Sequence, residues 1–97
     1  MQLPLQVAFQ GMPHSPAVDA RIREHVAKLE KHHSRLSSCR VGIEPVGLHK
    51  AHGHRYAVHV ELHAPDRPPI VSTRHESEDV YVAVRDAFAA VERQLGG

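Results

Sequence analysis

SEDVYVAVRDAFAAVERQL, residues 77–95, carries the clearest structural signal in this sequence. Apolar residues recur in it at steps of three and four, which places them on one side of a helix. Ser77 is a suitable N-cap, Glu78 and Asp79 then fall in the first turn, and Gly96 follows as a stop. We therefore expect an amphipathic helix here whose apolar side, packed on a core, consists of Val80, Val84, Ala87, Phe88, Val91 and Leu95.

Upstream of this helix the pattern changes to the alternation that is typical of strands. Apolar and polar residues alternate over residues 3–9, 38–43 and 55–63, and a short apolar run at 70–73 follows a Pro-rich turn. Another helix should start near Pro16, with Ser15 as its N-cap, and should end near Arg35.

The order of these elements is βαβββα. The first two strands should be parallel if they are neighbours, because a helix connects them, and the second and third strands should form a hairpin. We therefore expect an α+β fold, a two-layer sandwich in which a four-stranded mixed sheet carries both helices on one face. A length of 97 residues suits a single domain spanning residues 1–97.

The composition excludes several classes of protein. The sequence has no apolar run long enough for a membrane span and no signal peptide, so we expect a cytoplasmic protein. A lone cysteine, Cys39, shares strand parity with Val41 and Ile43 and should be a buried thiol. Because no catalytic or phosphate-loop motif is present, we expect neither an enzyme nor a cofactor or small-molecule substrate.

Charge is segregated on the helix that starts at Pro16, although the net charge of the whole chain is only +1. At 100° per residue, one flank of this helix has Glu24 as its only acid, whereas the other flank is mixed. A row of cations of this kind is what a phosphate backbone would contact, and it is also found on helices that merely face solvent. The basic flank consists of Arg21, His25, Lys28, Lys31, His32 and Arg35.

Ten histidines make the charge of this chain unusually sensitive to pH near pH 6. Histidines are also metal ligands, and a His-based metal site is one alternative, formed by His49, His52 and His54. His59 and His63 share a strand face but would lie roughly 13 Å apart along the strand. No cysteine or acid of matching spacing accompanies them, so we expect no metal.

Short motifs spread over nearly the whole chain give a resemblance to a known family. They are Met1-Gln2-Leu3 at the start, Ser15-Pro16-Ala17-Val18, Lys28-Leu29-Glu30-Lys31, Asp79-Val80-Tyr81-Val82-Ala83-Val84 and Glu92-Arg93-Gln94-Leu95. With the βαβββα order, these motifs resemble the ribosome hibernation-promoting factors, also called ribosome-associated inhibitors or sigma-54 modulation proteins. Since the chain ends just after Leu95, it resembles the short form of the family.

The resemblance implies a translation inhibitor that binds the small ribosomal subunit in the mRNA and tRNA channel during stress or stationary phase. Its partner would be ribosomal RNA, contacted through basic residues. The residues that match are Arg21, Lys28, Lys31 and Arg35 on the first helix, Lys50 in the connection before residue 55, and Arg85 and Arg93 on the last helix.

The sequence departs from the family pattern at Arg85, where members usually have an acid, and it has only three lysines. Because histidine or arginine stands at many of these positions, we expect ribosome affinity to rise between about pH 7.5 and 6. The near-neutral net charge favours one more alternative, a divergent family member that acts as an interaction module for a protein partner.

Overall fold

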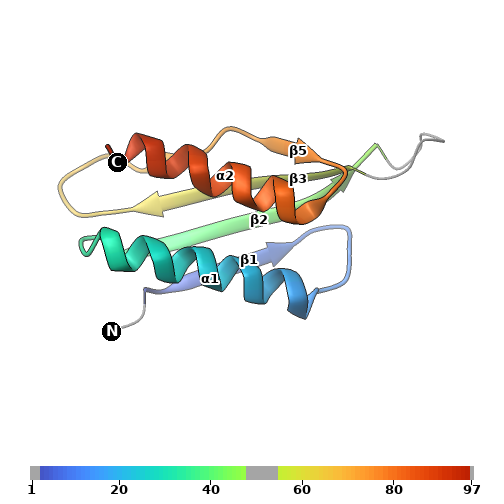
Figure 1. The fold of residues 1–97 in the computed structure, drawn as a ribbon, viewed down its shortest axis with the longest axis horizontal. Coiled ribbons are helices and arrows are strands. Elements are labelled where there is room, and N and C mark those ends of the chain that lie inside the picture. Colours follow the sequence, from blue (N-terminus) through green and yellow to red (C-terminus); the bar gives the residue numbers. More distant parts are fainter. Residues whose placement is uncertain (1–2, 48–54, 97) are drawn as a thin grey trace.

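Two helices pack on one face of a mixed sheet (Figure 1). The computed structural model describes residues 3–47 and 55–96. The chain order is β1 (Leu5–Phe9), α1 (Pro16–His32), β2 (Ser38–Val46), β3 (Arg55–His63), β4 (Ile70–Val71), β5 (His75–Ser77) and α2 (Val80–Gln94). The expected α+β class, with both helices on the same face, is confirmed.

The sheet has β1 at one edge, followed by β2 and then β3. β1 and β2 are parallel, with Leu5 opposite Cys39 and Phe9 opposite Ile43, as the intervening helix predicts. β2 and β3 form the expected antiparallel hairpin, from Ser38 opposite His63 to Val46 opposite Arg55. β4 and β5 both pair with β3.

One short strand was expected at residues 70–73, but the structure has β4 at residues 70–71 and a second short strand, β5, at residues 75–77, after a β-bulge. The described residues therefore form a five-stranded sheet and not the expected four-stranded one. Val71 lies opposite Glu61 in β4, but His75 lies opposite Val58 in β5, so three residues face two at the break. Ser72 lies in this break and bonds twice to Val60. Its N–H donates to the Val60 carbonyl, and its hydroxyl oxygen accepts from the Val60 N–H, both at 2.8 Å.

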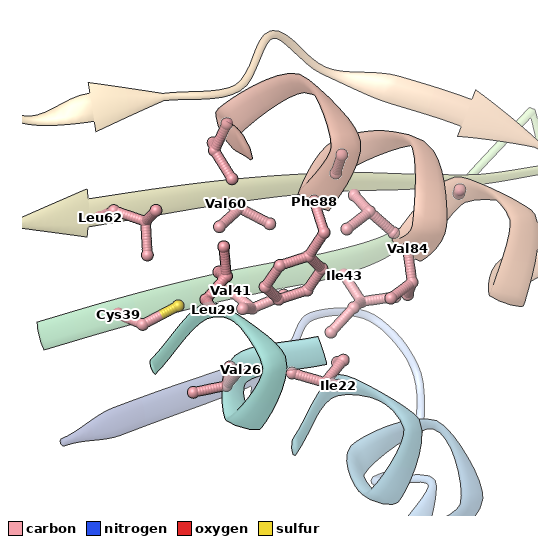
Figure 2. Packing of buried hydrophobic residues seen from close by; sticks show 14 of the residues in the cluster. Ile22, Val26, Leu29, Cys39, Val41, Ile43, Val60, Leu62, Val84 and Phe88 are labelled. Atoms are coloured by element: carbon pink, nitrogen blue, oxygen red, sulfur yellow. The ribbon is translucent and has the colours of Figure 1, made fainter. Parts of the chain in front are cut away.

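The core lies between the helices and the sheet, where the apolar residues of both layers interdigitate (Figure 2). Ile22 from α1, Val41 from β2, Val60 from β3 and Val84 from α2 are fully buried. Cys39 is buried as expected, and this burial raises the pKa of its thiol to about 12. The Cys39 thiol is therefore protonated and unreactive at neutral pH.

The helix starts follow their caps, but two boundaries differ from expectation. The Ser15 hydroxyl accepts from the Val18 N–H at 3.3 Å, so α1 starts as predicted. It ends at His32, three residues early. The N-cap of α2 is Asp79 and not Ser77, because Ser77 is still paired with Tyr56 in the sheet. Neither helix in the part of the chain that the structure describes has the length and hydropathy of a membrane span.

Candidate nucleic-acid interface

A groove runs along the seam between α1 and α2. Both helices begin at the same end of the molecule and run in the same direction (Figure 1). Three adjoining cavities, of about 330, 230 and 530 Å³, follow one another along this seam. The first two share His25, Lys28 and Arg85, and the second and third share Ala89 and Glu92. We call this continuous depression the inter-helix groove.

Arginine and tyrosine meet in the first section of the groove, near the start of both helices. The Arg21 guanidinium carbon lies 5.0 Å from the centre of the Tyr81 ring, within the range of a cation–π contact. Glu24 is a weak competitor for Arg21, with 4.0 Å between Nε and Oε2, and half of the Arg21 side chain is exposed. Arg21 is thus held over an aromatic face with its charge available to solvent.

Arg85 brings a cation to the groove from α2, opposite Lys28. It lines the first two cavities, and about two thirds of its side chain is exposed. Its guanidinium donates to Oδ1 of the neighbouring Asp86 at 3.2 and 3.3 Å. Exposed pairs of this kind contribute little to stability, so the Arg85 guanidinium can exchange Asp86 for another anion in the groove.

His25 and Phe88 stack across the middle of the groove, with 5.0 Å between ring centroids and 9° between ring planes. Burial lowers the pKa of His25, and the nearby cations Lys28 and Arg21 lower it further, whereas Glu24 and Glu92 act in the opposite direction. His25 is therefore neutral at neutral pH.

The structure places most of the predicted site residues along the groove, but not all of them. Arg21, Lys28 and Arg85 line the first part of the groove, and Arg93 lines its last section beside His32. Lys31 is exposed on α1 but lines none of these cavities. The prediction that Arg35 lies on α1 is wrong, because the chain has by then left the helix and turned toward β2. Lys50 lies outside the described residues.

Arg35 instead joins the turn after β3. It pairs with Asp66 at 2.8 Å, in a bridge that is more than three quarters exposed on both sides. Leu36 next to it packs against the core, which pulls this segment away from the helix axis. Arg35 therefore lies apart from the row that Arg21 and Lys28 form.

Three further residues, His25, Tyr81 and Glu92, line the groove but were not among the predicted site residues. His25 was visible on the basic flank of α1. The spacing of Tyr81, Arg85 and Glu92 at steps of four and seven also puts them on one side of α2. Their orientation toward α1 depends on how the helices pack, which spacing alone does not give.

Arg55 and Arg74, on the opposite face of the sheet, are paired with acids. Arg55 lies 3.7 Å from Glu76, and Arg74 lies 3.3 Å from Glu44 and 3.4 Å from Glu76. Arg40 donates to the Gln6 side chain at 3.2 Å. On this face Arg55 and Arg74 are therefore paired with acids, whereas Arg40 is bonded to an uncharged amide.

The sequence matches the family described as "Sigma 54 modulation protein / S30EA ribosomal protein" over residues 5–96. The chain belongs to this family. The S30EA family is the one that the sequence motifs resembled, so that prediction is confirmed. Its members bind ribosomes and are not enzymes, which agrees with the expectation of no enzymatic activity. Membership points to a ribosome-associated protein.

Solved structures share the S30EA fold. A ribosomal subunit interface protein from Coxiella burnetii aligns with a TM-score of 0.81 and 20% identity, over 97% of this chain and 94% of that chain. The N-terminal domain of Protein Y from Thermus thermophilus gives 0.58 and 17% identity, with the same coverage of both chains. A comparison with curated proteins gave no match.

The histidines of this S30EA chain also suggested a metal site as an alternative. No group of three possible metal ligands occurs among residues 3–47 and 55–96. His63 is hydrogen-bonded to Glu61 on its own strand. His49, His52 and His54 lie outside the described residues, so the alternative that depends on them stays a prediction.

Proposed function

We propose that this protein binds the small ribosomal subunit and that its inter-helix groove contacts ribosomal RNA phosphates. The observation that carries this proposal is the placement of Arg21, Lys28 and Arg85 along one groove. Arginine supplies forked donors that suit phosphate oxygens, and lysine supplies a compact charge.

Family membership supports the rest of this proposal. It makes a cytoplasmic translation inhibitor of stress or stationary phase the expected role. In that role the protein would occupy the channel that mRNA and tRNA use on the small subunit.

Sedimentation with purified ribosomal subunits tests the binding. Wild-type protein should comigrate with the small subunit, less so as salt is raised, because phosphate contacts release counterions. The double variant Arg21→Glu with Lys28→Glu should bind much less. The control Arg40→Glu with Arg67→Glu makes the same change of charge outside the groove, on the sheet face and in the turn after β3, and should still comigrate. Free protein at the top of every gradient would refute the proposal.

Competition tests the position on the ribosome. Small subunits preloaded with mRNA and initiator tRNA should bind the protein weakly, and added protein should reduce tRNA binding to empty subunits. If preloaded and empty subunits bind the protein equally well, the site lies outside the channel.

A further inference from the structure

His25 lies at the centre of the inter-helix groove and belongs to its first two cavities. Its ring is stacked on Phe88 and is therefore held in one orientation. A stacked imidazole presents its two nitrogens at the ring edge, where each can donate once the ring is protonated. This places a titratable donor among the cations that the proposed function uses.

Charged groups from both helices surround His25. On α1, Arg21 and Lys28 lie one turn away on either side, with Glu24 adjacent. On α2, Arg85 and Glu92 line the same section. In the free protein the partial burial, and after it the cations, lower the pKa of the imidazole and keep it neutral at neutral pH. A bound anion would add negative charge beside the ring and would therefore act to raise this pKa.

We propose that His25 takes up a proton when RNA phosphates occupy the inter-helix groove, so that ribosome binding strengthens as the pH falls. This inference rests on the proposed function. A phosphodiester beside Arg21 and Lys28 offsets their repulsion of the imidazolium and accepts a hydrogen bond from it. The proton comes from solvent and stays on the ring while the RNA is bound.

The direction of the pH dependence follows from linkage. Bound phosphate raises the pKa of His25 above its lowered value in the free protein. At high pH the ring is neutral in both states and contributes nothing. As the pH falls through the pKa of the bound state, the complex holds more protons than the free protein and the affinity increases. The increase ends below the pKa of the free state.

Dissociation constants for small subunits, measured at about pH 8 and pH 6 and at constant ionic strength, test this inference. The ratio of the two constants is compared for wild type, His25→Gln and His25→Phe. The phenylalanine variant keeps an aromatic ring on Phe88 but cannot bind a proton. His59→Gln on the sheet face is the matched control. NMR titration of the His25 ring with and without a short single-stranded RNA reports its pKa directly.

The wild-type affinity should rise several-fold, with a limit of about tenfold for each pH unit between the free and bound pKa values of His25. Both His25 variants should have a smaller ratio, and His59→Gln should keep the wild-type ratio. If wild type binds but the His25 variants show the same ratio, or if RNA leaves the His25 titration unchanged, this inference is overturned and the proposed function stands. If wild type fails to bind at either pH, both are overturned.

Discussion

Arg21 is positioned by Tyr81, whose ring lies beneath its guanidinium at 5.0 Å. The sequence identified Arg21 by its charge and Tyr81 only as part of a family motif. It did not show that they touch, because they are 60 positions apart and on different helices. At this scale, residue types were predictable, whereas the partner of each side chain was not.

We expect Tyr81→Leu to weaken ribosome binding roughly two- to fivefold, which corresponds to a cation–π contact of about 0.5–1 kcal/mol at an exposed site. Tyr81→Phe retains the aromatic face and should bind like wild type. In the Arg21→Gln background, Tyr81→Leu should cause no further loss of binding, because Tyr81 acts through Arg21. An equal loss from Tyr81→Leu in the Arg21→Gln background would show that Tyr81 does not act by positioning this arginine. Binding curves for the four variants and wild type give the comparison.

Among the elements, those with local signals were predictable from sequence. Ser15 and Pro16 mark the start of α1, and alternation marks β2 and β3. The other boundaries are set by contacts distant in sequence. Ser77 in β5 pairs with Tyr56, so α2 starts after Asp79 and not after Ser77. The end of α1 has no glycine signal, because the helix ends where the chain turns back toward β2.

The bulge between β4 and β5 depends on one buried hydroxyl. Ser72→Ala would leave the Val60 N–H without its 2.8 Å acceptor in a buried site, which costs about 1–3 kcal/mol of unfolding free energy. Thr73→Ala, next to it but exposed, should change the stability by less than about 0.5 kcal/mol. Urea unfolding of the two variants measures both values. Equal stability of the two would mean that water replaces the Ser72 hydroxyl.

At the scale of the whole molecule, the overall architecture followed from the order of elements, and the family from motifs scattered along the chain. The inter-helix groove did not follow from either. A helical wheel located the basic flank of α1, but only the packing of α1 beside α2 shows that this flank meets Arg85 and Tyr81. Such a surface depends on how the two helices are placed relative to each other. The spacing of residues along either helix does not give this placement.

A net charge of +1 gives the molecule little overall attraction to RNA, so any attraction must be local, and this can be measured. If Arg21, Lys28 and Arg85 each neutralise one phosphate, the logarithm of the binding constant should fall with the logarithm of salt concentration with a slope of about −2 to −3. Changing any one of them to Gln should reduce the slope by about one. Arg74→Gln should leave it unchanged, because Arg74 lies outside the groove, on the sheet face, where it pairs with Glu44 and Glu76. A wild-type slope near zero, or equal reductions from groove and sheet variants, would show that binding does not use these cations as phosphate contacts.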